Sequence, residues 1–157
     1  MMIIRKATLL DIEGLHRLLD QVGEVHHMGR PDLFKAGAHK YNTDELNKLF
    51  NDPLCPIFCA VDENNWMMGY CFCLTHQHVN NSVLTDIKTL YIDDLCVDET
   101  CRFQGVGRAL YAHVLQYAKA NGYYNVTLNV WGFNASAMKF YESLGMSVQK
   151  VGMEQIL

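Results

Sequence analysis

The segment from residue 89 to residue 131 constrains the fold of this chain more than any other. Thr89–Val97 is rich in β-favouring residues and predicts a strand, and residues 104–120 carry apolar side chains at helical spacing. Asn121-Gly122 is a helix stop signal, after which residues 125–131 predict another strand. A strand, a helix and a strand in this order favour a right-handed crossover, which makes the two strands parallel.

The remaining elements extend this unit into a mixed sheet. The capping-box pattern Thr8-x-x-Asp11 precedes a first helix that is expected to fray near Gly23, and residues 24–40 have no period and predict irregular structure. The three strands before the long helix are predicted to be antiparallel. The order β-α-α-β-β-β-α-β-α-β predicts an α/β fold, with further strands at residues 3–7, 57–61, 67–75 and 147–154 and helices at 12–22, 43–50 and 134–144.

Length and charge limit the classes of function. The 157 residues fit a single domain over residues 1–157, large enough to form a core without metal or disulfide staples. With 13 basic against 17 acidic residues the net charge is −4, which disfavours nucleic acid as a main partner. No apolar stretch approaches the roughly 18 residues of a membrane span, and the N-terminus turns polar too soon for a signal peptide. We expect a soluble cytoplasmic protein with no membrane partner.

The six cysteines and seven histidines form no recognisable scaffold. Cys59, Cys71 and Cys73 lie inside apolar runs and no C-x-x-C pair is present, which predicts reduced, buried thiols. The two histidine clusters, at 26–27 and 76–78, have no companion Cys or carboxylate at metal-ligand spacing. We therefore expect neither a disulfide framework nor a metal site.

The turn before the long helix carries two glycines one residue apart. Gly105 and Gly107 lack a Cβ, so the backbone can approach a ligand closely. The first amides of the helix lie at the positive end of its dipole and suit a phosphate or pyrophosphate, towards which Arg102 and Arg108 add cationic groups. A dinucleotide fingerprint needs a third glycine where Leu110 stands, and the P-loop pattern fails at the same place. Glycines that serve only close helix–sheet packing are the alternative.

The pattern Arg102-x-x-Gly105-x-Gly107 resembles the acyl-CoA pyrophosphate loop of the GNAT superfamily of N-acetyltransferases. Residues 93–98 before it are similar to that family's fourth strand. Residues 128–131 resemble its fifth strand, and the pattern Asn134-x-x-Ala137-x-x-Phe140-Tyr141-x-x-Leu144-Gly145-Met146 resembles its fourth helix, with Met146 in place of the usual aromatic residue. The run Arg30-Pro31-Asp32-Leu33-Phe34 also recurs in the substrate-side region of some members. The resemblance implies a GNAT-like mixed central sheet of six or seven strands, splayed between strands 4 and 5.

The activity implied by this resemblance is transfer of an acetyl group from acetyl-CoA to a primary amine of a small molecule or peptide. Backbone amides at a bulge in the fourth strand would hold the pantetheine arm and the thioester carbonyl, and the amides that follow Arg102 would hold the pyrophosphate. A homodimer is implied by family habit alone. The residues implied to bind the cofactor are Leu95, Cys96, Val97, Arg102, Phe103, Gln104, Gly105, Val106, Gly107, Arg108, Asn134, Ala137 and Tyr141.

Three side chains are the implied catalytic groups. Tyr141 shares a helix face with Asn134, two turns earlier, and would protonate the leaving thiolate. Asp93 and Asp94 point to opposite faces of a regular strand, so only one should face the amine unless the bulge intervenes. Asp93 is the preferred base and Asp94 the second, although a free aspartate near pKa 3.9 needs burial or a relaying water to deprotonate an ammonium near 10.4. The residues expected on the acceptor side are His26, His27, Arg30, Phe34 and Tyr91.

Several alternatives stay open from the sequence. Tyr141 could be an aromatic residue packed on the sheet, one acid could simply cap the end of the strand, and His26, His27 and Tyr91 are reserve bases. A catalytically silent acyl-CoA-binding sensor would bind CoA without releasing its thiol in the presence of any amine. The presence of Tyr141 together with the paired acids favours an enzyme, and adjacent acids favour a cationic acceptor such as a polyamine or an amino sugar.

Overall fold

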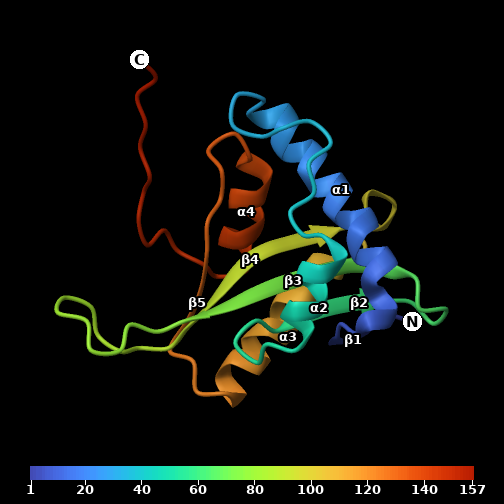
Figure 1. The fold of residues 1–157 in the computed structure, drawn as a ribbon, viewed down its shortest axis with the longest axis horizontal. Helices are drawn as coiled ribbons and strands as arrows, with labels where there is room; N and C mark the ends of the chain where they lie inside the picture. Colours follow the sequence, from blue (N-terminus) through green and yellow to red (C-terminus); the bar gives the residue numbers. More distant parts are fainter.

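The computed structural model describes residues 1–157 and contains one five-stranded sheet (Figure 1). Its strands lie in sequence order: β1 (Ile3–Lys6), β2 (Ile57–Val61), β3 (Met67–His76), β4 (Thr89–Val97) and β5 (Asn125–Leu128). Neighbours from β1 to β4 are antiparallel, and β5 runs parallel to β4 because a helix connects them. The predicted α/β class and strand directions are confirmed.

Helices cover both faces of the sheet (Figure 1). α1 (Ile12–Gly29) and α2 (Thr43–Phe50) lie across one face, and α3 (Val106–Ala120) packs on the other. α4 (Ala135–Ser143) lies beside the N-terminal part of α3. No helix combines the length and the apolar character that crossing a bilayer requires.

Each face of the sheet has its own apolar core. Leu110 and Val114 of α3 are completely buried on one face, and Leu15 and Leu18 of α1 are completely buried on the other. All five residues of β2 are buried, as expected for a strand covered on both sides. Each buried aliphatic or aromatic side chain stabilises the fold by about 1.5–3 kcal/mol. Five of the six cysteines belong to these buried regions, as predicted.

The capping signals act where the sequence places them. Thr8 accepts from the backbone of Leu10, and Asp11 closes the predicted capping box around the short 3₁₀ turn Leu9–Asp11. Arg5 donates to both oxygens of Asp11, at 2.8 and 3.0 Å, which fixes β1 to this turn. A second capping box between Asn42 and Glu45 starts α2.

The first helix is longer than predicted. α1 continues past Gly23 to Gly29, so His26 and His27 lie on a helix and not in irregular chain. Gly23 does not act as a stop: a Cβ at this position would lie 2.9 Å from the carbonyl oxygen of Ala38. This glycine permits close packing of the segment that follows α1.

The sheet has five strands, fewer than the six or seven expected. The final strand predicted at residues 147–154 is not formed, and residues 147–157 are exposed and extended. Val148 and Val151 are β-favouring residues, but no strand of this chain lies beside this segment. β5 also ends earlier than predicted, at Leu128, because it separates from β4 there.

A buried ion pair holds the turn between β4 and α3. Asp98 is 1% exposed and accepts from the amide and hydroxyl of Thr100, at 2.9 and 2.7 Å, which starts the 3₁₀ turn Glu99–Cys101. Arg17 of α1 forms an ion pair with the same carboxylate and donates to the carbonyl of Met67 at 2.7 Å. One carboxylate therefore connects α1, β3 and the start of the turn that leads to α3.

We expect Asp98→Ala to lower the free energy of unfolding by about 3 kcal/mol, because it removes a turn cap and leaves Arg17 without its partner. Urea denaturation measures this change. Asp20→Ala is the matched control, since the exposed Asp20–His39 pair should contribute less than about 1 kcal/mol. Equal losses in the two variants would contradict a structural role for the buried pair.

Candidate active site

β4 and β5 separate halfway along β4. Their pairing runs from Thr89 and Asn125 to Ile92 and Leu128, after which β4 continues to Val97 with β3 as its only neighbour. This is the splay expected between the fourth and fifth strands.

Along the part of β4 that β5 does not pair with, successive backbone amides point alternately towards β3 and towards the opening. The Asp98 amide donates to Met68 on the β3 side, so the amides of Val97 and Leu95 face the opening. The amide of Cys96 faces β3, and its buried thiol lies 3.6 Å from the carbonyl oxygen of Leu18. Burial raises the pKa of the Cys96 thiol to about 12, so this group stays neutral. The opening therefore offers two backbone donors, from Leu95 and Val97.

A bulge in β4 places two adjacent acids on one face of the sheet. Phe72 pairs with Asp94 and Cys73 with Ile92, so Asp93 is an extra residue without a partner on β3. Side chains of a regular strand would alternate, and the bulge removes this alternation between Asp93 and Asp94. Both carboxylates consequently lie on the face covered by α1 and α2.

Each of the two acids accepts a hydrogen bond from a tyrosine hydroxyl. The hydroxyl of Tyr41, before α2, donates to Asp93 at 2.8 Å, and the hydroxyl of Tyr70, on β3, donates to Asp94 at 2.7 Å. The ammonium of Lys40 forms an ion pair with Asp93 at 2.8 Å. Burial raises the pKa of Asp94, against the opposing effects of Tyr70, Lys40 and a neighbouring histidine. Asp93 thus binds a cation, whereas Asp94 lies in a less polar environment.

Tyr141 of α4 is a half-buried phenol within electrostatic range of Asp94. Burial is the main cause that raises its pKa, and the groups of Cys71 and Asp94 add to the shift. Its ring packs against Phe140, with 5.1 Å between centroids, and lies 6.4 Å from Tyr111. Its hydroxyl forms no hydrogen bond within the chain. A phenol with a raised pKa is protonated at neutral pH and can donate to a ligand.

The turn before α3 presents consecutive free amides. Gly105 is the N-cap of α3 with φ of 80°, and Phe103 has φ of 64°, so the chain curls before the helix starts. None of the amides from Phe103 to Arg108 donates to a backbone carbonyl. Arg102 and Arg108 are exposed and form no ion pair. The residues of this turn, including Gln104 and Val106, fit a diphosphate.

The two glycines of the turn have different roles. A Cβ at Gly107 would lie 3.1 Å from the ring of Phe140, so this glycine lets α4 approach α3. A Cβ at Gly105 would meet open space, and its positive φ is the reason for glycine there. The packing alternative therefore holds for Gly107, and backbone conformation explains Gly105.

Asn134 starts α4. Its side-chain oxygen accepts from the Ala137 amide and the Ser136 hydroxyl, each at 3.1 Å. Only its side-chain NH₂ is left to donate to a ligand. The predicted cap is confirmed, and the arrangement places Ala137 in the first turn of α4.

An aromatic row borders the acids on the acceptor side. His26 stacks on Phe34 at 4.9 Å between ring centroids, and Phe34 meets the edge of Trp131 at 5.1 Å. Trp131 stacks on Phe133, and a Cβ at Gly29 would lie 2.2 Å from the ring of Phe133. Burial lowers the pKa of His26, Lys40 adds to this, and Asp94 opposes it. The row connects the end of α1 with the segment between β5 and α4.

Three predicted acceptor-side residues contact groups other than the acids. His27 bonds the carbonyl of Phe34 at 2.7 Å through Nδ1. Arg30 pairs with Asp32 at 2.7 Å and also with Glu154. Tyr91 stacks on His76 at 5.2 Å between centroids and accepts from Asn129 at 3.1 Å.

Residues that contact the acids were missed by the sequence analysis. Tyr70 belongs to a strand expected to supply core residues, Lys40 ends the stretch without a period, and Tyr41 follows it. Trp131 lies in the recognised motif but no role was expected for it. Adjacent acids in a buried strand need hydrogen-bond donors. This need is the one signal in the sequence that pointed to nearby tyrosines and lysines.

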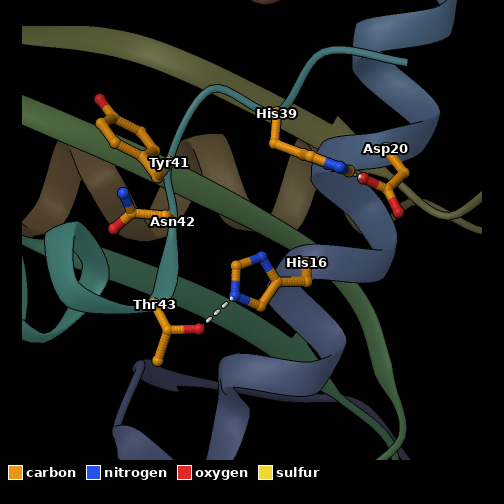
Figure 2. Close-up of a pocket in the computed structure, with 6 residues that line it drawn as sticks. All are labelled: His16, Asp20, His39, Tyr41, Asn42 and Thr43. Carbon is orange, nitrogen blue, oxygen red and sulfur yellow. Dashed lines mark hydrogen bonds and ion pairs between the residues drawn. The ribbon is translucent and has the colours of Figure 1, made fainter.

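A separate hollow of about 330 Å³ lies between α1 and the segment before α2 (Figure 2). His16 bonds the hydroxyl of Thr43 at 3.0 Å, and His39 pairs with Asp20 at 2.5 Å. The ring of Tyr41 borders this hollow, while its hydroxyl points away from His16 and Thr43 and reaches Asp93. The hollow contains neither the free amides nor Tyr141, so it is distinct from the opening between β4 and β5.

Comparison with known proteins identifies the family. Residues 22–146 match the acetyltransferase (GNAT) family. The chain belongs to the acetyltransferase (GNAT) family. The resemblance of residues 93–107 and 134–146 to this family is thereby confirmed.

Individual relatives agree with this assignment. The X-ray structure of the tetramutant of the BH1408 protein from Bacillus halodurans is 35% identical and covers 99% of both chains, with a TM-score of 0.93. The peptidyl-lysine N-acetyltransferase YjaB of Salmonella typhimurium is 29% identical over 115 residues, 73% of this chain and 66% of that protein. Human N-acetyltransferase 8B is 43% identical over 58 residues, 37% of this chain and 26% of the human protein. The matched region is thus about a quarter of this human relative.

We expect Tyr70→Phe to destabilise this GNAT protein in a pH-dependent way. Loss of the donor raises the pKa of Asp94 further, so the loss of stability is small in acid, where the carboxyl is neutral. It grows to about 1.5–3 kcal/mol as the pH rises past the pKa of Asp94, because a charged carboxylate then lacks its donor. Urea denaturation at pH 4 and pH 8 measures both limits. In an Asp94→Asn background the effect of Tyr70→Phe should not depend on pH, and persistence of that dependence would contradict the assignment.

Proposed function

We propose that this GNAT protein transfers an acetyl group from acetyl-CoA to a primary amine of a small molecule or peptide by direct attack on the thioester. One observation carries the proposal. The separation of β4 from β5 exposes the amides of Leu95 and Val97 between paired acids and the unbonded hydroxyl of Tyr141. These are the groups that acyl transfer to an amine requires: an oxyanion donor, a base and an acid.

The chain's own residues fit the cofactor. The amides from Phe103 to Arg108, with Arg102 beside them, would hold its diphosphate. The backbone of residues 95–97 and the side chain of Asn134 would hold the pantetheine arm. Acetyl-CoA, when bound, supplies the acetyl group as an activated thioester. The amides of Leu95 and Val97 would donate to oxygen-centred charge at that carbonyl.

Lys40 supports a primary ammonium as the acceptor group. Its Nζ lies 2.8 Å from a carboxylate oxygen of Asp93 and 3.4 Å from the carbonyl oxygen of the same residue. A substrate ammonium that displaces Lys40 would meet the same two acceptors. The stacked rings of His26 and Phe34 would cover the apolar part of such a substrate.

The two acids then have different roles in the reaction. Asp93 holds the ammonium, as it holds Lys40. Asp94 has a raised pKa because it is buried, which makes it a stronger base than an ordinary carboxylate and suits it to accept the substrate's proton, directly or through water. This assignment reverses the order of preference drawn from the sequence. Tyr141 keeps its proton at neutral pH because of its raised pKa and can deliver it to the leaving thiolate.

We expect Tyr141→Phe to lower kcat by about 100-fold or more while CoA affinity is retained, because only the proton donor is removed. Release of free CoA thiol with a panel of primary amines measures kcat, and calorimetry measures CoA binding. Tyr124→Phe, at an exposed tyrosine, is the matched control and should keep wild-type rates. Binding of CoA without thiol release for any amine would support the silent sensor instead.

We expect Lys40→Ala to lower the KM for the amine up to about fivefold with a smaller change in kcat. The substrate ammonium then no longer competes with an ion pair worth up to about 1 kcal/mol, since the Lys40 side chain is 41% exposed. Lys40→Arg retains the competing cation and should keep the wild-type KM. Lys35→Ala controls for general loss of positive charge in the same exposed segment. A raised KM in Lys40→Ala would mean that Lys40 helps to bind the substrate.

A further inference from the structure

The aromatic row beside the paired acids is fixed in place from both ends. The segment between β5 and α4 reaches the end of α1, where a Cβ at Gly29 would lie 2.2 Å from the ring of Phe133 (Figure 1). A glycine at this position therefore leaves the space that this ring occupies. At the other end, His27 is hydrogen-bonded through Nδ1 to the carbonyl oxygen of Phe34 at 2.7 Å. The row is thus formed by contacts within the chain.

The four rings of the row form two stacked pairs that meet at a right angle. The planes of His26 and Phe34 are inclined by 28°, and those of Trp131 and Phe133 by 13°. Phe34 and Trp131 meet at 86°. A planar ring placed in such a corner stacks on one pair and meets the other edge-to-face, and these are the two arrangements that aromatic rings prefer.

Part of this corner is open to solvent. Trp131 is 44% exposed and Phe133 is 37% exposed, although both are large apolar side chains, and Phe34 is partly exposed. Single exposed apolar residues are common, whereas exposed apolar side chains that lie together mark binding surfaces. The open part of the row therefore suits an apolar group of a ligand.

His26 connects the row with the acids. Burial lowers the pKa of its imidazole, Asp94 opposes this shift and Lys40 adds to it, so both charged groups lie within electrostatic range of the ring. A histidine with a lowered pKa is neutral at neutral pH and stacks on Phe34 without adding a positive charge. An ammonium beside the acids and an apolar group on the row can therefore belong to one molecule.

The carboxylates nearest the row in the sequence are already paired. Asp32, two residues before Phe34, forms an ion pair with Arg30 at 2.7 Å, and Glu154 pairs with the same guanidinium. A polyamine carries further ammonium groups along its chain, and on the row these would meet aromatic rings in place of free carboxylates. Of the cationic acceptors that the sequence leaves open, the arrangement favours one with a single ammonium followed by an apolar group.

We propose that the acceptor of this GNAT protein is a small arylalkylamine, whose ammonium binds Asp93 and whose aromatic ring lies in the corner between Phe34 and Trp131. This substrate class rests on the function proposed above and concerns the same site. The ammonium takes the place of Nζ of Lys40, 2.8 Å from the Asp93 carboxylate. The ring displaces water from Trp131 and gains apolar and stacking contacts that an aliphatic or polyhydroxylated amine does not match.

The acceptor nitrogen forms its bond to the acetyl carbon as the bond from that carbon to sulfur breaks. The ammonium loses two protons in the overall reaction. One passes to solvent through Asp94, and the other replaces the proton that Tyr141 gives to the sulfur. The products are an N-acetylated arylalkylamine and free CoA thiol.

Amine selectivity tests the substrate class. We expect kcat/KM for 2-phenylethylamine, measured by release of CoA thiol, to exceed that for n-butylamine, spermidine and glucosamine at least about tenfold. Trp131→Ala should raise the KM for 2-phenylethylamine about tenfold with little change for n-butylamine. Tyr124→Ala, at a tyrosine 74% exposed outside the row, is the matched control and should keep the preference. Equal values for 2-phenylethylamine and n-butylamine, or higher values for spermidine or glucosamine, overturn the proposal.

Tryptophan fluorescence separates the substrate class from the function on which it rests. The chain has two tryptophans, so the emission of Trp66→Phe reports on Trp131 alone. With and without CoA, 2-phenylethylamine should change this emission to saturation. At the same concentrations n-butylamine, which lacks the ring, and phenylacetate, which has the opposite charge, should not.

Saturable binding of 2-phenylethylamine without thiol release for any amine would refute the proposed function and still support the arylalkylamine site. An emission that does not respond to 2-phenylethylamine would refute this site, whether or not other amines are acetylated. Circular dichroism of Trp66→Phe and Trp131→Ala confirms that both variants are folded.

Discussion

Beyond Ile92 the backbone of β4 has a neighbouring strand on only one side. Backbone amides require hydrogen-bond acceptors. β5 cannot supply them to this part of β4, because β5 ends at Leu128. Tyr141 and Leu144, on and after α4, pack against the core on the α3 face of the sheet. The open amides and the approach of α4 both depend on this separation.

The bulge at Asp93 adds a second constraint. One extra residue places two carboxylates on the same face, where mutual repulsion and burial would both be costly without donors. Tyr41, Lys40 and Tyr70 supply those donors from a different segment and a different strand. The environments of the two acids differ as a result: one binds a cation, and the other has a raised pKa. A carboxylate with a raised pKa next to one that binds a cation suits acid–base chemistry on an amine.

The buried ion pair of Arg17 and Asp98 fixes the turn before α3. Asp98 follows the last residue of β4, so its bonds to α1 and to Thr100 fix where the turn begins. Gly105 then reverses the backbone, and α3 starts with its amides free. The turn before α3 is therefore attached to α1 through the Asp98 carboxylate.

Local signals in the sequence determined most elements, because capping boxes, helical periodicity and turn residues act over a few neighbouring positions. They also identified the family through the turn at Gly105 and the helix that carries Tyr141. The tertiary structure decided what depends on distant segments. Gly23 lies within α1, where it lets Ala38 approach closely, and Tyr70 meets Asp94 because β3 and β4 pair in one particular register. Residues 147–154 were predicted from the local sequence to form a strand, but no strand of this chain lies beside them, and a single strand without a paired neighbour is not formed.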